Sequence, residues 1–466
     1  MVLISKETRA QGRGSLVMGA ALSGIAAAKL LVFLGARVAV SEKKPIEQLE
    51  KEKKELDNLG VKIISEAEAE KNLASFSLLV VSPGVPINHP IIATARSLGA
   101  EVIGEIELAF RFISCPILAV TGSNGKSTVT DLTGYILKKA GLDCYVGGNI
   151  GSPLADLAIE QSQGQAQNIK WAVVEISSFQ LETIESFKAR GAAFLNLTPD
   201  HLDRHATMES YFELKKRIFN LQGPKDLSII NLDDPLLSTI SPRGRVFGFS
   251  RSKRSDFGAY LEENEIIVVE NSKIVARADF KSFSLFGAHN QENVMAAVGL
   301  CYAAQIEPQR ALDLACDYKS SEHRLSLVGS YGGVDFVDDS KATNVGAVAR
   351  ALESFDRPII LILGGRDKDL DFSYLAPYLK DRVKLIVAMG ECREKVKAAL
   401  ESVKPVRLAV DMKQAVSIAS QEAKSGEVVL LSPATASFDQ FRDYKHRGEV
   451  FAREASLFYQ GASPQM

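Results

Sequence analysis

Residues 117–128 read ILAVTGSNGKST, an apolar run that passes into a glycine-rich turn and then a lysine. The apolar run predicts a buried strand, and the residues from Lys126 to about Lys139 predict a helix. At such a turn the backbone N–H groups bind phosphate, a lysine reaches the β- and γ-phosphates, and a hydroxyl ligates Mg²⁺. The full Walker pattern is not met, because Val120 stands where its first glycine would be. A solvated helix start is the alternative, but the order of strand, turn and helix favours a phosphate-binding loop.

The composition is that of an ordinary soluble globular protein. The 466 residues are 46% hydrophobic and 24% charged, which argues against disorder, a disulfide-stapled miniature fold and a membrane-embedded body. The length predicts about two to four domains. With 55 Lys and Arg against 57 Asp and Glu, the net charge is −2, so neither nucleic acid nor a membrane surface is an expected partner. Any anionic ligand must be held by a local site.

The cysteines and the first residues of the chain indicate a reducing compartment. The cysteines are odd in number and form no C-x-x-C pair, which argues against a disulfide framework and a zinc site. They are Cys115, Cys144, Cys301, Cys316 and Cys392. Basic residues before the apolar stretch 16–28 resemble a signal peptide. However, strand-like runs at 16–18 and 37–41 flank a helical run at 25–34, which favours a βαβ unit and a cytoplasmic protein.

Strand-like and helical segments alternate along most of the chain, which is the pattern of α/β domains built on parallel sheets. We expect three such domains, residues 1–104, 105–320 and 321–466, the last of them a small doubly wound sheet. The expected strands lie at 77–81, 117–120, 171–176, 193–197, 334–337, 359–363, 385–388 and 428–431, with a β-rich patch at 246–285.

Two polar segments follow expected strands of the central domain. Residues 175–182 read EISSFQLE, and Glu175 ends a strand of the same sheet as the phosphate loop, where a carboxylate is well placed to bind Mg²⁺. Residues 198–205 read TPDHLDRH, and their two His and two Asp suggest metal or proton chemistry. The alternatives are a surface glutamate and an ordinary polar turn, and the residues alone leave them open.

A lysine falls within the apolar arc of a predicted helix at residues 209–221. At a helical period this arc comprises Tyr211, Phe212, Leu214, Ile218, Phe219 and Leu221. Lys215 lies in its middle. Either the side chain snorkels to water, or the amine is desolvated, so that its pKa falls and it becomes reactive, modifiable or paired with an anion. Periodicity leaves the choice open.

Polar segments also follow strands of the third expected domain. Residues 322–324, 338–344, 363–368 and 431–441 read EHR, DDSKATN, LGGRDK and LSPATASFDQF. Functional residues gather at such element ends, so together the segments predict a polar cleft at the carboxyl edge of a sheet. Each could also be a turn with a helix cap.

Taken in order, the segments resemble the Mur ligase family over nearly the whole chain. The phosphate loop is shared by Mur ligases and folylpolyglutamate synthetases, whereas residues 175–182, 339–344 and 431–441 resemble the branch that adds D-glutamate. The resemblance implies an α/β fold of three domains. These are a Rossmann-like N-terminal domain for the UDP-sugar, a central P-loop-type ATPase domain, and a Rossmann-like C-terminal domain that closes over the amino acid.

The resemblance also implies a reaction, cofactors and partners. ATP would phosphorylate the alanyl carboxylate of UDP-N-acetylmuramoyl-L-alanine, and the amine of D-glutamate would then displace phosphate, in peptidoglycan precursor synthesis. Such an enzyme must bring three anions together and keep water out. ATP, two Mg²⁺ ions and a carbamoylated Lys215 are implied, in a cytoplasmic monomer that binds neither nucleic acid nor membrane.

The matched motifs imply the site residues. Lys126, His201 and Lys215 would be catalytic, and Ser127, Glu175, His201 and Lys215 would serve the metal ions. ATP would be bound by Gly122, Ser123, Asn124, Gly125, Lys126, Ser127, Thr128, Asn290, Asn293, Arg324 and Asp339. The UDP-sugar would contact Leu22, Ser23, Glu42, Lys43, Ser82 and Asn149. D-Glutamate would contact Thr343, Lys368, Ser437 and Phe438.

Three other classes of protein were weighed against this hypothesis. Another Mur or folylpolyglutamate ligase would keep the loop and change the amino acid, but residues 179–180 and 437–441 argue against it. A Rossmann dehydrogenase would explain the turn at 19–24 and would need neither Lys126 nor Glu175. A regulatory module that has lost catalysis is disfavoured, because every expected chemical group is present.

Overall fold

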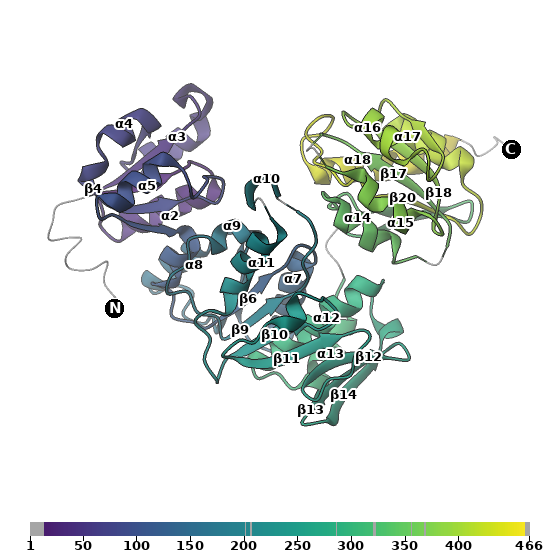
Figure 1. The fold of residues 1–466 in the computed structure, drawn as a ribbon, viewed down its shortest axis with the longest axis horizontal. Helices are drawn as coiled ribbons and strands as arrows, with labels where there is room; N and C mark the ends of the chain where they lie inside the picture. The colour runs from purple at the N-terminus through teal and green to yellow at the C-terminus, as the bar shows by residue number, and fades with distance from the viewer. Residues whose placement is uncertain are drawn as a thin grey trace. The chain divides into compact units, whose positions relative to one another are not determined.

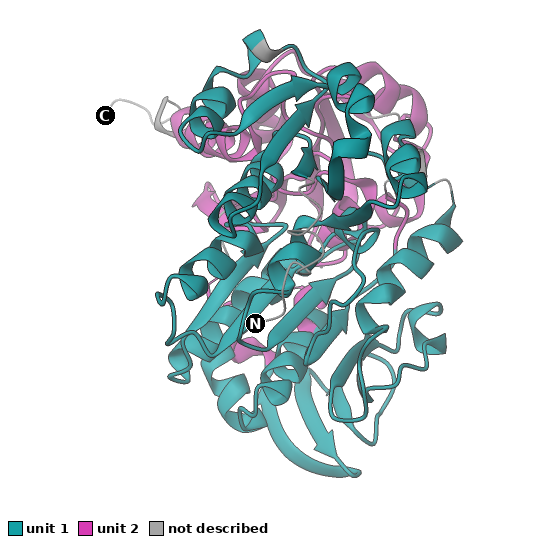
Figure 2. Cartoon of the chain, turned by 90° about the vertical axis from the view of Figure 1, so that its left-hand side faces the viewer, with its two compact units in different colours: residues 1–197, 201–279, 292–315 teal, residues 198–200, 280–291, 316–466 magenta. Residues whose placement is uncertain are grey.

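The computed structural model describes residues 14–200, 202–205, 207–285, 287–319, 323–355, 357–367 and 370–461. The chain forms two compact units, one of residues 1–197, 201–279 and 292–315 and the other of residues 198–200, 280–291 and 316–466 (Figure 2). Two sheets lie in the first unit and a third lies in the second (Figure 1). Within the described ranges, every helix is too short or too polar to cross a membrane.

The first sheet has five parallel strands in the order β3-β2-β1-β4-β5, which is a Rossmann-like arrangement. Its strands are β1 (Gly14–Met18), β2 (Val38–Glu42), β3 (Lys62–Ser65), β4 (Phe76–Val81) and β5 (Glu101–Gly104), and its helices are α2 (Leu22–Phe33), α3 (Glu50–Asp57), α4 (Glu66–Lys71) and α5 (Pro90–Ser97). The expected βαβ start is confirmed. The helix begins earlier than expected, at Leu22, because Gly24 allows its first turn to approach the strand end. A Cβ at Gly24 would lie 1.9 Å from the Gly19 carbonyl oxygen.

The second sheet has nine strands in the order β14-β13-β12-β11-β10-β9-β6-β8-β7. The strands from β12 to β7 pair in parallel, and β13 and β14 add an antiparallel edge. The strands are β6 (Ile117–Thr121), β7 (Cys144–Gly148), β8 (Trp171–Glu175), β9 (Gly191–Phe194), β10 (Leu227–Asn231), β11 (Arg245–Ser250), β12 (Gly258–Glu262), β13 (Glu265–Glu270) and β14 (Lys273–Asp279). The helices around them are α6 (Glu105–Phe110), α7 (Lys126–Lys139), α8 (Leu154–Ser162), α9 (Ser178–Leu181), α10 (Leu202–His205), α11 (Met208–Lys216), α12 (Ala288–Ala303) and α13 (Pro308–Cys316).

The third sheet has six strands in the order β15-β16-β20-β17-β18-β19, parallel except for the edge strand β15. The strands are β15 (Ser326–Tyr331), β16 (Val334–Asp338), β17 (Ile359–Gly364), β18 (Val383–Met389), β19 (Val406–Leu408) and β20 (Val428–Leu431). The helices are α14 (Val345–Leu352), α15 (Ala376–Leu379), α16 (Arg393–Leu400), α17 (Met412–Glu422) and α18 (Tyr444–Gly461). The expected doubly wound sheet is confirmed.

Two elements of the central region end before the expected residue. β9 ends at Phe194, and beyond it the Asn196 carbonyl oxygen accepts a hydrogen bond from the Ser123 N–H of the phosphate loop at 3.0 Å. The helix α11 ends at Lys216 and passes into a 3₁₀ turn. Leu221 lies beyond that turn and is 46% exposed, so its placement in the buried arc was wrong.

One hydrophobic core joins the first two sheets. Helices α2, α6 and α8 pack against one another, and their apolar side chains, such as Leu30, Leu108 and Leu157, belong to a single buried cluster with residues of both sheets. Burial of apolar side chains contributes about 1.5–3 kcal/mol each. This core therefore holds one face of the first sheet against the central region.

An ionisable group lies inside this shared core. Glu105 begins α6 and is 3% exposed. Its Oε1 accepts a hydrogen bond from the Ala155 backbone N–H at 2.6 Å, whereas Oε2 has no hydrogen-bond partner among the described residues. Burial raises the pKa of Glu105 to about 7; the Ala155 N–H opposes this shift, and the negative charge of Asp156 adds to it.

Glu105→Gln should remove a pH-dependent loss of stability. The carboxyl pKa is about 7 in the folded chain and about 4.3 in an unfolded one, so between these values the folded state binds more protons. The free energy of unfolding of the wild type therefore falls as the pH rises from about 4.3 to above 7. The Gln variant keeps the acceptor oxygen, and at pH 8 it should be the more stable protein by up to about 4 kcal/mol. Urea unfolding at pH 5.5 and pH 8 tests this, and an unchanged difference between the two proteins would contradict it.

Candidate active site

The phosphate loop, Glu175 and the residues directly after β9 meet at one edge of the second sheet. β6 lies between β9 and β8, and all three run parallel. The phosphate loop follows β6, Glu175 ends β8, and residues 195–197 follow β9 in the same unit. The carboxyl ends of parallel strands face the same side, where α/β sheets bind their ligands. The strand order alone therefore brings the three segments together (Figure 1).

The phosphate loop has a backbone that requires glycine. Gly122 and Gly125 have φ values of +152° and +83°, and a Cβ on Gly125 would lie 2.4 Å from the Asn293 Oδ1. The Lys126 Nζ donates hydrogen bonds to the carbonyl oxygens of Gly122 and Ser123, each at 2.9 Å. The loop thus opens onto the N-terminus of α7, a helix of 14 residues, as a phosphate site requires. Asn293, expected to bind nucleotide, touches this loop.

Asn196 braces the loop from the neighbouring strand, a role that the sequence analysis missed. Its Oδ1 accepts a hydrogen bond from the Asn124 N–H at 2.9 Å, and its Nδ2 donates to the Asn124 carbonyl at 3.1 Å. The side chain is 4% exposed. An Asn inside the expected strand 193–197 was the available signal, because a buried amide there must find hydrogen-bond partners.

Glu175 fits the predicted role of a metal ligand. It is 2% exposed; its Oε1 accepts a hydrogen bond from the Asn149 Nδ2 at 2.8 Å, and its Oε2 has no hydrogen-bond partner in the described part of the chain. Mg²⁺ prefers oxygen ligands, including carboxylates, and pairs them with phosphate oxygens. Ser127, the second residue of α7, supplies a hydroxyl at the same loop. These oxygen donors fit Mg²⁺, while His201 lies outside the described residues.

Lys215 is buried and does not snorkel to water. The side chain is 1% exposed. Its Nζ donates to the Gly122 carbonyl at 2.8 Å, lies 3.5 Å from the Thr121 Oγ1, and stands 4.7 Å from the centre of the Tyr211 ring. The structure therefore decides between the two interpretations of the helical arc and directs the amine to the phosphate loop. Tyr211, expected only as a core residue, also accepts a hydrogen bond from the Ser123 Oγ at 3.3 Å.

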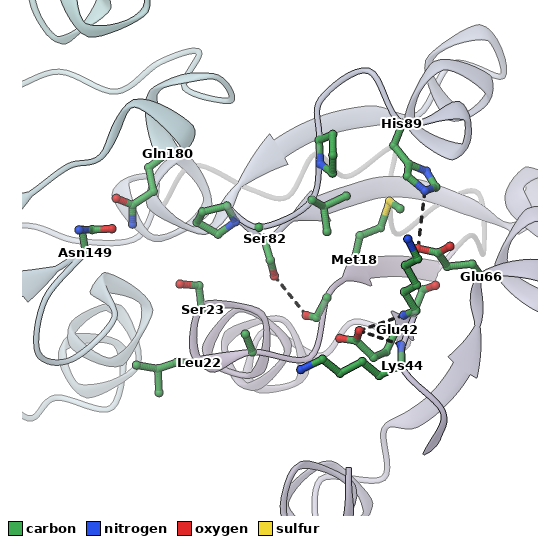
Figure 3. A pocket seen from close by; sticks show the side chains of 18 of the residues that line it. Met18, Leu22, Ser23, Glu42, Lys44, Glu66, Ser82, His89, Asn149 and Gln180 are labelled. Carbon is green, nitrogen blue, oxygen red and sulfur yellow. Dashed lines mark hydrogen bonds and ion pairs between the residues drawn. The ribbon is translucent and has the colours of Figure 1, made fainter. Parts of the chain in front are cut away.

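A pocket of about 1000 Å³ opens at the carboxyl edge of the first sheet (Figure 3). All six residues expected at the UDP-sugar line it: Leu22, Ser23, Glu42, Lys43, Ser82 and Asn149. Most of its wall comes from the first sheet, and Asn149 and Gln180 reach it from the central region (Figure 3). Glu42 is held in place because its Oε2 accepts the Ala20 N–H at 2.7 Å. Lining residues that the sequence analysis missed include Lys44, Glu66, His89 and Gln180.

The second unit gathers polar residues at the ends of two neighbouring strands, β16 and β20. Asp339 follows β16 and accepts a hydrogen bond from the Ser432 Oγ, beyond β20, at 2.8 Å. Burial raises the pKa of Asp339 to about 7. The hydrogen bond from Ser432 and the positive charge of Arg324 oppose this shift, and the negative charge of Asp338 adds to it. Asp339 and Arg324, both expected at the nucleotide, are thus neighbours.

The residues expected at D-glutamate follow the same strands. Thr343 comes after β16, and Ser437 and Phe438 come after β20. Ser437 is 2% exposed and Phe438 is 63% exposed. Lys368 lies outside the described residues. Asn290, in α12, belongs to this second unit and is buried, whereas Asn293 on the same helix belongs to the first.

The chain belongs to the Mur ligase family. Three family models match it: the Mur ligase MurD-like N-terminal domain over residues 13–104, the Mur ligase middle domain over 120–301, and the Mur ligase glutamate ligase domain over 323–435. The expected three-domain α/β architecture is confirmed. The Rossmann dehydrogenase alternative is excluded by this membership.

Relatives with one name cover nearly the whole chain. The chain is 43% identical to the "UDP-N-acetylmuramoylalanine--D-glutamate ligase" of Koribacter versatilis, over 95% of this chain and 96% of the relative. It is 41% identical to the protein of the same name from Syntrophus aciditrophicus, over 96% of this chain and 98% of the relative. These identities place the similarity within the D-glutamate branch that the motifs indicated.

Solved structures with the same fold are more distant in sequence. A pseudomurein peptide ligase type C from Methanothermus fervidus is 16% identical, with a TM-score of 0.60 over 95% of this chain and all of the other. A MurF ligase from Thermotoga maritima in complex with ADP is also 16% identical, with a TM-score of 0.59 over 90% of this chain and 95% of the other. At these identities the likeness concerns the fold.

Gly125→Ala should abolish nucleotide binding at a moderate cost in stability. A side chain at φ +83° is strained by about 1–2 kcal/mol, and its Cβ would push Asn293 away from the loop. We expect the affinity for a non-hydrolysable ATP analogue, measured by calorimetry, to fall at least tenfold. Gly141→Ala is the matched control: its φ is +88° and nothing lies within 4 Å of its Cβ, so it should cost similar stability and leave binding unchanged. Equal binding losses in both variants would contradict the assignment.

Proposed function

We propose that this protein is an ATP-dependent ligase that joins D-glutamate to UDP-N-acetylmuramoyl-L-alanine, giving ADP and phosphate, in peptidoglycan precursor synthesis. One observation carries the proposal: a phosphate loop lies beside a buried carboxylate, Glu175, one oxygen of which has no hydrogen-bond partner among the described residues. The name shared by relatives at 41–43% identity supports the choice of substrates. The matched ranges support domain boundaries near residues 104 and 321.

The reaction begins with phosphoryl transfer to the substrate. A carboxylate oxygen of the alanyl group forms a bond to the γ-phosphorus of ATP, and the bond to the ADP oxygen breaks. Lys126, the loop N–H groups and the N-terminus of α7 bind the phosphates and stabilise the charge that moves onto the leaving oxygen. Mg²⁺, when bound, neutralises phosphate oxygens. Glu175 and Ser127 would hold one ion, and His201 with Lys215 would hold a second.

The second step forms the amide bond. The neutral amine of D-glutamate attacks the carbonyl carbon of the acyl phosphate, the amine loses a proton, and the C–O bond to phosphate breaks. Thr343, Lys368, Ser437 and Phe438 would orient the amino acid, and Asn290, Arg324 and Asp339 would contact the nucleotide. Orientation of the amine and exclusion of water are the two contributions that such residues make.

Carbamoylation of Lys215 is consistent with its surroundings. Lys126 and Lys215 both donate to one carbonyl oxygen, that of Gly122, at 2.9 and 2.8 Å. Two ammonium groups so placed repel each other by about 3 kcal/mol at an effective dielectric constant near 20. Addition of CO₂ to the neutral amine, with loss of a proton, replaces one of the two cations by an anion with two oxygen ligands. Such a group would suit a divalent metal.

The compartment and the oligomeric state are further parts of the proposal. The enzyme would act as a cytoplasmic monomer, where ATP and its nucleotide-linked substrate are available. A net charge of −2 is in keeping with binding to neither nucleic acid nor anionic membrane.

Phosphate release should depend on D-glutamate. With ATP, Mg²⁺ and UDP-N-acetylmuramoyl-L-alanine, the protein should release phosphate on addition of D-glutamate and not of L-glutamate, L-alanine, L-lysine or meso-diaminopimelate. The product mass should equal that of the two substrates joined with loss of water. Activity with another of these amino acids would move the protein to another branch of the family, and inactivity with all five would refute the proposed reaction.

Lys215→Ala should lose turnover by at least a hundredfold and regain part of it in added short carboxylates such as formate or acetate, which can occupy the place of the carbamate. Steady-state phosphate release at rising carboxylate concentration measures the rescue. Lys126→Ala is the control, since it removes a phosphate contact that no carboxylate can supply; it should stay inactive. Full activity of Lys215→Ala without rescue would exclude the carbamate.

A further inference from the structure

Two adjacent residues of α10 face two different ligand sites of the first unit. Arg204 contacts Val85 of the large pocket, and His205 contacts Tyr211, which in turn contacts the phosphate loop. The sequence predicted no role for Arg204, whereas His205 is one of the two histidines for which it suggested metal or proton chemistry. The helix α10 contains four residues, Leu202–His205, so its position depends on these side-chain contacts.

Arg204 joins the first sheet to the central region. Its Nη2 donates hydrogen bonds to the Val85 carbonyl oxygen at 2.9 Å and to the Glu182 Oε2 at 2.7 Å. The guanidinium carbon lies 5.0 Å from the centre of the Phe179 ring. The Arg204 side chain is 17% exposed and that of Glu182 is 8% exposed, so the ion pair is shielded from water and holds one geometry.

One partner of Arg204, Val85, lines the pocket, and the other, Glu182, lies two residues after the lining residue Gln180. Val85 lines the pocket, as does Gln180, which lies between Phe179 and Glu182 in and beside α9. The loop that carries Val85 is itself held to β1, because the Val85 N–H donates to the Ser82 carbonyl at 2.9 Å and the Ser82 Oγ donates to the Gly19 carbonyl at 3.1 Å. Arg204 therefore fixes two parts of the pocket wall relative to each other.

His205 connects the same helix to the ATP side. Its Nε2 lies 2.9 Å from the Ser178 Oγ, and its ring stacks on Tyr211 with 5.1 Å between centroids. Tyr211 in turn contacts Ser123 of the phosphate loop and Lys215. His205 is 4% exposed. A continuous set of packed side chains thus runs from Val85 through α10 to the phosphate loop.

We propose that Arg204 is a positioning residue that sets the distance between the substrate held in the pocket and the ATP held at the phosphate loop. The inference rests on the proposed function, since it places the alanyl carboxylate of the sugar nucleotide beside the γ-phosphate. A small misplacement of reacting groups costs up to about 10²-fold in rate. Arg204 acts through Val85 and α9 and touches neither reacting atom.

The test compares Arg204→Met with Arg204→Lys. Met keeps an apolar stem over Phe179 and removes both hydrogen bonds. Lys keeps a charged donor. Because Arg204 donates both hydrogen bonds from one nitrogen, a single ammonium group can make both of them. We expect kcat of Arg204→Met to fall at least tenfold with KM for ATP within threefold of the wild type, and Arg204→Lys to stay within fivefold in kcat. Arg190→Met, which removes an ion pair to Asp226 elsewhere in the same unit, is the control and should keep its kcat.

Three kinetic outcomes would overturn the proposal. They are a loss of kcat below tenfold in Arg204→Met, an equal loss in Arg190→Met, and an Arg204→Lys enzyme as slow as Arg204→Met. A purely structural role would lower the melting temperature of Arg204→Met and leave kcat unchanged.

Hydrogen exchange of the ligand-free protein tests the same contact without the reaction. The Val85 amide should exchange at least tenfold faster in Arg204→Met than in the wild type, and at the wild-type rate in Arg190→Met. An unchanged Val85 amide would overturn the inference by itself. A wild type without D-glutamate-dependent turnover would instead refute the proposed function, and the exchange rate would then decide the role of Arg204 separately.

Discussion

The carbonyl oxygen of Gly122 accepts hydrogen bonds from two lysine side chains, and the active site is arranged around it. Lys126 comes from the helix that follows the loop, and Lys215 comes from α11, far along the chain. Gly122 itself adopts a φ of +152°, a backbone conformation that favours glycine. Two ammonium groups held at one carbonyl oxygen attract anions, and a low-dielectric environment strengthens that attraction.

Polar side chains behind the loop keep that geometry fixed. Asn196 pairs with the backbone of Asn124 on both its donor and its acceptor side. Asn149 donates to the Glu175 carboxylate and at the same time lines the large pocket of the first sheet. Preorganised groups of this kind need no rearrangement at the moment of reaction, which is why they lower its barrier.

The pocket and the loop are held together by two kinds of contact. The core of α2, α6 and α8 joins the first sheet to the central one by apolar packing, which is strong and has little directional preference. The hydrogen bonds of Arg204 to Val85 and Glu182 depend on angle as well as distance, so they fix the orientation of the two parts. Apolar burial thus sets the overall spacing of the two ligand sites, and the buried ion pair refines it.

The sequence by itself determined the class of fold, the phosphate loop, the carboxylate of Glu175 and the family. These depend on local order: a strand, a glycine-rich turn and a helix are adjacent in the chain, and strand periodicity is a short-range property. The nine-strand order, which places β6 between β9 and β8, was not available from the chain, because strand pairing is a long-range choice.

Tertiary structure decided what periodicity had left open at Lys215. A lysine in an apolar arc can extend to water or turn inward, and only the packing of Tyr211 and the approach of the Gly122 carbonyl selected the buried position. The roles of Asn196 and Arg204 were likewise decided by tertiary structure. Their partners, Asn124, Val85 and Glu182, are distant in sequence, so the value of each side chain appears only when the sheets bring those partners within hydrogen-bond distance.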